Sequence, residues 1–174
     1  LTDADNNIYG LDLPIYDKNG GYTWNWLPFL WQNGGEFLND DRTEAMFNSP
    51  EGVEALEFWK KMVQEDKSVP LQAAPTGVNR FTSGITAMVL DGPWSLNTFL
   101  SDPEFKDKFG VAPLPQKKTR ATVVGGEGVA VFSNTKSPQE AYDYLVHLTC
   151  SDFVQTFWEN WITIPPQPEF KDFY

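Results

Sequence analysis

Short apolar runs along the chain have the alternation or the length of β-strands. Residues 8–15 (IYGLDLPI) alternate well enough for a strand, and residues 86–90 (TAMVL) form an apolar run short enough for a buried strand. Residues 109–114 (FGVAPL) are a further short apolar run. Residues 122–132 (TVVGGEGVAVF) are of β type but contain three glycines, which indicate a bulge, a bend or a close approach of the backbone to another group.

Two stretches in the first part of the chain predict amphipathic helices. In the first stretch the apolar residues follow helical spacing and are Trp24, Leu27, Leu30 and Trp31. Gly34 is expected to end this helix. The sequence Ser49-Pro50-Glu51 predicts the start of the second helix. A serine N-cap accepts a hydrogen bond from a first-turn amide that has no partner within the helix, and proline fits the first position because it has no amide hydrogen. We expect its core-facing stripe to consist of Val53, Leu56, Trp59, Met62 and Val63. Between them, residues 36–42 (EFLNDDR) predict a short strand and an acidic turn.

The second half of the chain continues the alternation of helices and loops. Residues 78–83 and 95–100 predict short helices on either side of the 86–90 strand, and residues 116–120 (QKKTR) a basic, exposed loop. Ser137 and Pro138 repeat the helix-start chemistry ahead of a stripe of Ala141, Tyr144, Leu145 and Leu148. A last helix is expected from residue 151, with an apolar face of Phe153, Val154, Phe157, Trp158 and Trp161.

Composition and charge narrow the classes of protein that this chain can be. Its 174 residues, 41% of them hydrophobic, can bury one sizeable core, which predicts one domain or two unequal parts. A net charge of −11 disfavours nucleic acid and anionic lipid as partners, because both would repel the surface. Cys150 and His147 are each the only residue of their type, which excludes an internal disulfide and a zinc site of cysteines or histidines. We expect a structural role for His147 and no cofactor.

The chain carries no recognisable targeting or membrane segment. No apolar run approaches the length of a membrane span, and no basic-then-apolar leader is present. The sequence begins at Leu1 without a methionine, so we expect a processed or excised piece whose secretion signal would lie upstream.

The stretch of residues 84–95 (GITAMVLDGPWS) carries the main ligand-binding candidate. Asp91-Gly92-Pro93 turns the backbone after the predicted strand and delivers Trp94 at the strand's exit. In an open α/β sheet, ligands bind beyond the carboxyl ends of the strands, so a tryptophan there is a candidate platform. The alternative is that Trp94 is a core residue, which is common for tryptophan.

Five motifs in a fixed order add a resemblance to these patterns. They are residues 47–63 (FNSPEGVEALEFWKKMV), 81–94 (F-x-x-G-x-x-AM-x-x-x-GPW), 109–115 (FGVAPLP), 123–131 (VVGGEGVAV) and 137–148 (SPQEAYDYLVHL). In this order and spacing they closely resemble the extracellular solute-binding proteins of bacterial ABC sugar importers, the maltose-binding-protein-like group. That resemblance covers nearly the whole chain, although members of the family are much longer.

The resemblance implies an α/β fold with a particular domain organisation. We expect a periplasmic-binding-protein-like lobe, an open mixed sheet flanked by helices, that is incomplete relative to the two-lobe fold of the family. By the resemblance, residues 1–124 form most of the second lobe, residues 125–163 a crossing segment and helical part of the first lobe, and residues 164–174 a return crossing and tail.

The resemblance also implies which residues face a ligand in the cleft between the lobes. Trp94 matches the family's sugar-stacking aromatic, and Trp24, at a loop-to-helix entry, matches another aromatic that lines the cleft. Trp26 is a further candidate. The glycine-rich crossing contributes Gly125, Gly126 and Glu127.

The chemistry of sugars fits these residue types. A pyranose has an apolar face of C–H groups and a rim of hydroxyls, so its site needs flat aromatic rings together with neutral or acidic acceptors. Asp91 and Glu127 could accept hydrogen bonds from the hydroxyls, but Asp91 could equally cap the helix that follows it.

Three functions remain as alternatives. The main hypothesis is a non-enzymatic receptor of an ABC importer that binds a sugar or oligosaccharide and docks on a membrane permease. The second is a glycan-acting hydrolase fragment with Asp91 and Glu127 as its acid and base pair, and the third is an all-β lectin-like module. The receptor hypothesis implies an extracellular or periplasmic location, with anchoring through an N-terminal lipid absent from this chain. It also implies exposed apolar surface and self-association through residues 123–164.

Overall fold

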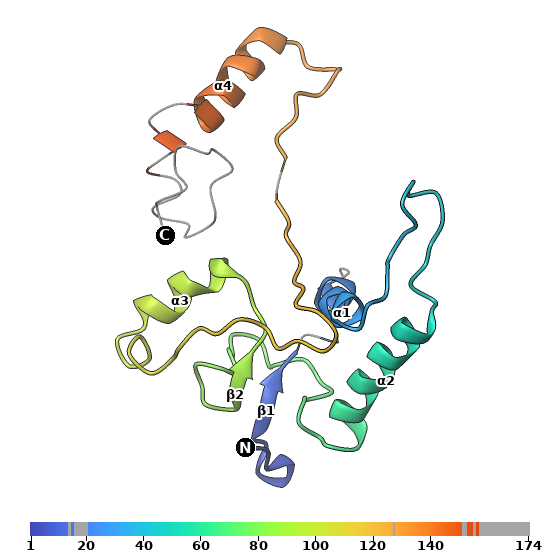
Figure 1. Cartoon of the computed structure of the whole chain (residues 1–174). Helices are drawn as coiled ribbons and strands as arrows, with labels where there is room; N and C mark the ends of the chain where they lie inside the picture. The colour runs from blue at the N-terminus through green and yellow to red at the C-terminus, as the bar shows by residue number, and fades with distance from the viewer. Residues whose placement is uncertain (14, 16–20, 127, 151–152, 155, 157–174) are drawn as a thin grey trace. The chain divides into compact units, whose positions relative to one another are not determined.

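The computed structural model describes residues 1–13, 15, 21–126, 128–150, 153–154 and 156 (Figure 1). The elements are η1 (Ala4–Asn6), β1 (Tyr9–Asp12), α1 (Gly21–Gln32), α2 (Pro50–Gln64), β2 (Thr86–Val89), η2 (Pro93–Ser95), α3 (Leu96–Ser101) and α4 (Pro138–Cys150). The chain divides into two compact units, of which the first combines residues 1–90 with 110–124 and the second combines residues 91–109 with 125–174. The predicted division at residues 124 and 163 stays a prediction.

The sheet of the first unit pairs the two strands that the hydrophobic pattern predicted. β1 and β2 run parallel, with Tyr9 opposite Thr86 and Asp12 opposite Val89 (Figure 1). The amide of Leu90 extends the pairing by donating to the Asp12 carbonyl oxygen at 3.2 Å. Among the described residues this sheet has two parallel strands, whereas a mixed sheet was expected. β2 is only partly buried, because Met88 remains 52% exposed.

The core of the first unit forms where β1 meets α2. Leu13, directly after β1, is fully buried, and it packs with Trp59, Met62 and Val69. From α1, Phe29 places its ring edge-on to Trp59 with a centroid distance of 5.7 Å. Burying side chains of this size stabilises a fold by roughly 1.5–3 kcal/mol each, so these contacts fix the two helices beside the strand.

The two helix boundaries predicted around this core are confirmed. α1 ends where Gly34 adopts a left-handed conformation with φ of 81°, and the Gly35 amide then donates to the Leu30 carbonyl oxygen at 3.0 Å. α2 begins after Ser49, whose hydroxyl oxygen accepts from the Gly52 amide at 3.2 Å.

The buried face of α2 differs from the predicted stripe. Trp59 and Met62 are buried as expected, but Val53 and Leu56 are 49% and 58% exposed. Their places on the buried face are taken by Gly52 and Ala55. The reason is a close backbone approach, since a Cβ on Gly52 would collide with the carbonyl oxygen of Phe47. Small residues, which carry little hydrophobic signal in the sequence, therefore set the orientation of this helix.

The helix predicted over residues 78–83 is a series of turns. The Asn79 side-chain oxygen accepts from the amides of Phe81 and Thr82 at 3.0 and 3.1 Å, which offers the backbone an alternative to helical bonds. Arg80, only 6% exposed, forms an ion pair with Asp12 at 3.2 Å. This buried pair joins the turns to the end of β1.

Three predicted β-type segments carry no strand in the described part of the chain. Residues 109–114 and 122–126 with 128–132 are irregular, and in residues 36–42 the expected strand is reduced to one bridge between Leu38 and Ala45. A strand needs a neighbouring ladder for its amides and carbonyls, and the described residues form none with residues 109–114 or with 122–126 and 128–132. Composition alone does not supply that partner.

Helices and aromatic residues build the second unit. η2 and α3 confirm the helix predicted over 95–100, and the ring of the buried Phe99 contacts those of Phe105 and Phe109 at 5.9 and 5.5 Å. α4 confirms the Ser137-Pro138 start, but Tyr144 of its predicted stripe is 64% exposed. Most of the helix predicted from residue 151 lies outside the described residues. None of the described helices combines the length and the apolar character that a membrane crossing needs.

Candidate functional site

Trp94 lies on a short turn that hydrogen bonds hold in place. It is the middle residue of η2, and its side chain is 54% exposed. The Asp91 carboxylate accepts from the Ser95 hydroxyl at 2.5 Å and from the Gly92 amide at 2.8 Å. The Ser95 amide donates in turn to the Gly92 carbonyl oxygen at 3.2 Å. The indole of Trp94 is therefore exposed, as a ligand platform requires, and Trp94 is not a core residue of the second unit.

Asp91 therefore has a local role that the sequence left open. Both of its carboxylate oxygens are engaged within the turn, one with Gly92 and one with Ser95. These bonds hold the turn, but Asp91 is not the predicted helix cap, because the N-caps of η2 and α3 are Gly92 and Ser95 and neither helix has a side-chain cap bond. Asp91 and Trp94 thus lie on the same short turn, which runs from Asp91 to Ser95.

Trp24 and Trp26 belong to the first unit and lie inside a helix. Trp24 was expected at a loop-to-helix entry, but α1 begins at Gly21, so Trp24 and Trp26 both lie within regular helix. Trp24 is 39% exposed. Trp26 is partly buried against the core around Trp59, and its indole nitrogen is buried without a hydrogen-bond partner. Only Trp24 of this pair presents substantial ring surface to solvent.

The glycine-rich segment belongs to the second unit. Gly125 and Gly126 are exposed and irregular, and a Cβ added to Gly126 would meet no atom within 4 Å. Glu127 lies outside the described residues. The acid and base pair of Asp91 and Glu127 that a hydrolase would need therefore has no observed geometry.

The described residues offer no constellation for metal binding. No group of three or more histidine, cysteine, aspartate or glutamate side chains among them could hold a metal ion. His147 stacks on Phe153 with a ring distance of 5.5 Å and an interplanar angle of 23°. The structural role expected for His147 stays a prediction.

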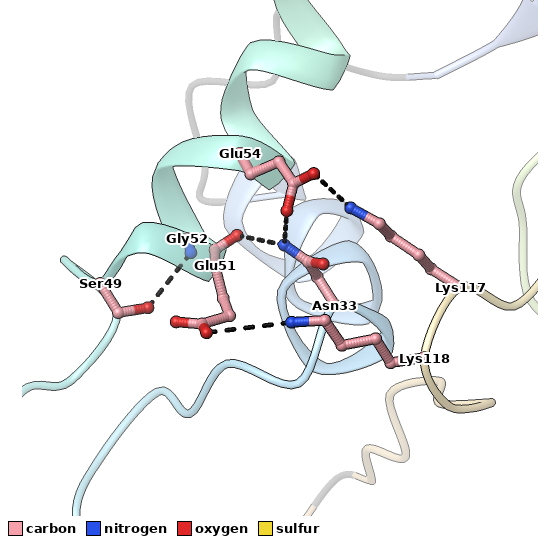
Figure 2. Close-up of polar contacts among 7 residues, drawn as sticks. All are labelled: Asn33, Ser49, Glu51, Gly52, Glu54, Lys117 and Lys118. Carbon is pink, nitrogen blue, oxygen red and sulfur yellow. Dashed lines mark hydrogen bonds and ion pairs between the residues drawn. The ribbon is translucent and has the colours of Figure 1, made fainter.

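A polar network in the first unit escaped the sequence analysis. The predicted basic loop docks on the ends of α1 and α2, where Lys117 forms an ion pair with Glu54 and Lys118 lies 3.9 Å from Glu51 (Figure 2). Asn33 joins the two helices by donating to the Glu54 carboxylate at 2.8 Å and to the Glu51 carbonyl oxygen at 2.9 Å (Figure 2). The only signal in the sequence is the complementary charge of loop and helix.

Backbone bonds strengthen the docking of this loop. The carbonyl oxygen of Gln32 accepts from the amides of Lys118 and Thr119 at 2.9 and 3.2 Å. The Gln32 side chain donates to the carbonyl oxygen of Ala121 at 2.8 Å. The loop is thus fixed to the end of α1 just before the glycine-rich segment begins.

The network lowers the pKa of its carboxylates. For Glu54 the main cause is the hydrogen bond from Lys117, followed by that from Asn33, which both stabilise the charged form. For Glu51 a bond from its own backbone amide and one from Ser49 lower the pKa, and the charge of Lys118 adds to them. Both carboxylates are therefore charged at neutral pH and bind the loop as anions.

Comparison with known proteins gives one family and several structural neighbours. The family described as bacterial extracellular solute-binding protein matches residues 10–172. The lactose-binding protein of Rhizobium radiobacter is 26% identical over 148 residues, which are 82% of this chain and 34% of the relative.

Two solved structures extend the likeness to the fold. An ABC transporter solute-binding protein from Thermotoga lettingae, bound with alpha-D-tagatose, is 28% identical with a TM-score of 0.82, over 98% of this chain and 44% of that one. The cyclic alpha-maltosyl-1,6-maltose binding protein from Arthrobacter globiformis is 29% identical with a TM-score of 0.69, over 98% and 44% of the two chains.

The predicted periplasmic-binding-protein-like α/β fold is confirmed by these neighbours. The chain spans about a third of the length of the curated relatives it matches and less than half of each solved structure. The prediction that the fold is incomplete relative to the family is confirmed as well.

Proposed function

Because the chain belongs to the family of bacterial extracellular solute-binding proteins, we propose that it is part of the receptor component of an ABC importer that captures a carbohydrate. The neighbours bound with alpha-D-tagatose or described as binding a cyclic maltosyl-maltose support a sugar as the class of ligand. A membrane permease is the proposed partner. The proposed location is extracellular or periplasmic, with lipid anchoring.

The observation that carries the proposal is the exposed indole of Trp94 on its braced turn. A ring that is 54% exposed, on a turn closed by Asp91 and Ser95, offers a flat apolar surface without the need to unfold anything. The C–H face of a pyranose can lie on such a ring, which adds roughly 0.5–1.5 kcal/mol beyond area burial. This is the chemistry expected of a receptor for a neutral, hydroxyl-rich solute.

The other ligand contacts of the proposal are weaker in their support. Trp24 has 39% of its side chain exposed and is the second candidate platform. The remaining proposed contacts are Trp26, Gly125, Gly126 and Glu127, and Asp91 belongs to the proposed site through the turn that it holds.

The proposal includes binding without catalysis. The Asp91 carboxylate is already used by the Ser95 hydroxyl and the Gly92 amide, so it lacks the free environment of a general acid. No observation favours the hydrolase, and the family match is to binding proteins.

Titration calorimetry on the full-length protein with lactose, D-tagatose, maltose and a neutral amino acid tests this function. We expect saturable binding of at least one sugar, weakened in Trp94→Ala but not in Tyr144→Ala, whose ring is also exposed but belongs to α4. Chromatography of each sugar after long incubation should recover it unchanged. Cleavage products, or binding of the amino acid alone, would contradict the proposal.

A further inference from the structure

Trp94 folds its six-membered ring back over the backbone of Gly92. A Cβ placed on Gly92 would lie 2.5 Å from Cζ2 of Trp94 and closer still to Cη2 and Cζ3. Contacts this short do not occur for real Cβ atoms, so the indole occupies the space that any other residue would need for its side chain.

Backbone conformation does not explain a glycine at this position. Gly92 has φ of −110° and ψ of 175°, an extended conformation that every L-residue adopts without strain. Pro93 also favours an extended residue before it, whatever its side chain. What glycine supplies here is the absence of a Cβ beneath the ring.

We propose that Gly92 is a positioning residue for the Trp94 platform, because its missing Cβ lets the indole lie against the turn and face outward in one orientation. This inference rests on the proposed function of Trp94 as a sugar platform. Restricting an exposed side chain before the ligand arrives reduces the entropy lost on binding, which is how preorganisation increases affinity. The hydrogen bonds of Asp91 hold the backbone of the turn, and Gly92 sets the ring on it.

The substitution Gly92→Ala displaces the ring while leaving the fold intact. The atoms that a new methyl group meets belong to the far end of an exposed side chain, which can rotate away. Gly110→Ala is the matched control, because a Cβ there meets no atom within 4 Å and its φ is not positive.

The test compares wild type, Gly92→Ala, Trp94→Ala and Gly110→Ala in the full-length protein, with the sugar that binds among lactose, D-tagatose and maltose. We expect Gly92→Ala to lose about 2- to 10-fold in affinity, the range for one aromatic contact, with an unchanged melting temperature. Gly110→Ala should bind like wild type. Unchanged affinity in Gly92→Ala, or a loss accompanied by an equal fall in melting temperature in both glycine variants, would overturn the inference.

A second readout needs no ligand and keeps the two proposals distinguishable. With the indole over Gly92, the α-protons of Gly92 should show a ring-current shift in the NMR spectrum that Trp94→Leu abolishes. If no sugar binds but this shift is present, the proposed function fails while the placement of the ring stands. If the shift is absent, Gly92 does not position Trp94 and the inference is overturned.

Discussion

The role of the Asp91 carboxylate depends on the groups that donate hydrogen bonds to it. From the sequence it was either a ligand acceptor or a cap, and in the structure its oxygens accept from Ser95 and Gly92. A carboxylate held by two donors of its own turn contributes to binding mainly by keeping that turn rigid.

The effect of Asp91 on sugar binding should therefore depend on its partner Ser95. We predict that Asp91→Ala and Ser95→Ala each weaken sugar binding by about 2- to 10-fold, because both remove the hydrogen bond between the two side chains, and that Asp91→Ala has the larger effect because it also removes the bond from the Gly92 amide. Calorimetry on the two variants and on the double variant measures this. A loss of binding free energy in the double variant that equals the sum of the two single losses would show that Asp91 acts on the sugar independently of Ser95, and would contradict this prediction.

Glu54 gives a prediction about pH. Its pKa is lowered from 4.5 chiefly by the hydrogen bond from Lys117, so the stabilisation from this pair is present above that value and is lost as pH falls through the lower, folded value. Carbon NMR titration should give a Glu54 midpoint below 4.5, and Lys117→Gln should raise it. Lys61→Gln, which removes the partner of Asp66, is the control and should leave Glu54 unmoved. If the titration midpoint of Glu54 is the same in Lys117→Gln as in the wild type, the loop is not held by this ion pair.

The helices show which parts of the fold the sequence could predict. The start of α2 followed from Ser49 and Pro50, and the stop of α1 from Gly34, because these residues act through bonds to their immediate neighbours. The buried face of α2 did not follow, because Gly52 and Ala55 carry little hydrophobic signal and Gly52 faces inward through its close approach to the Phe47 carbonyl oxygen. The β-type residues 122–126 and 128–132 likewise form no strand, because composition does not supply the neighbouring strand that a ladder needs.

Close packing at Gly52 reverses the usual effect of alanine in a helix. Glycine to alanine inside a helix normally stabilises it by about 1 kcal/mol, but here the new Cβ would meet the Phe47 carbonyl oxygen. We predict that Gly52→Ala destabilises the protein by about 1–3 kcal/mol in urea unfolding, the usual cost of overpacking. Val53→Ala on the half-exposed neighbour should cost less, about 1 kcal/mol or below. A more stable Gly52→Ala variant would show that α2 does not approach Phe47 closely.

For the candidate site, the sequence predicted the features that depend on neighbouring residues but not the contacts between distant segments. Trp94 was placed correctly on an exposed turn after a strand, because Gly92 and Pro93 punctuate the chain strongly. Trp24 was expected at a loop-to-helix entry, whereas α1 already begins at Gly21. The docking of the 116–120 loop on Glu51 and Glu54 was missed, since charge alone does not say which surface a loop meets.

The chain as a whole exposes apolar surface along its second unit. An open groove between residues 129–135 and α4 is lined by Val131, Phe132, Tyr144 and Leu145, and Phe132 is 80% exposed. Residues 128–132 are irregular and are followed by a turn at residues 133–134 before α4. An exposed apolar surface of this kind can associate with another chain.

We therefore predict that the isolated 174-residue chain self-associates. Analytical ultracentrifugation should show a concentration-dependent increase in mass, reduced by Phe132→Ser because that change removes the most exposed apolar ring of the groove. Phe47→Ser, on an exposed ring of the first unit, is the control and should leave the association unchanged. A monomer at all concentrations would refute this prediction.

Sugar capture by the whole molecule, as proposed, depends on contact between Trp94 and the bound sugar. Fluorine NMR of the full-length protein labelled with 5-fluorotryptophan, titrated with the sugar that binds, tests this contact most directly. The Trp94 signal, assigned through Trp94→Phe, should shift with the binding isotherm, while that of the buried core residue Trp59 should not. A Trp94 signal that stays in place while the sugar saturates the protein would contradict the account.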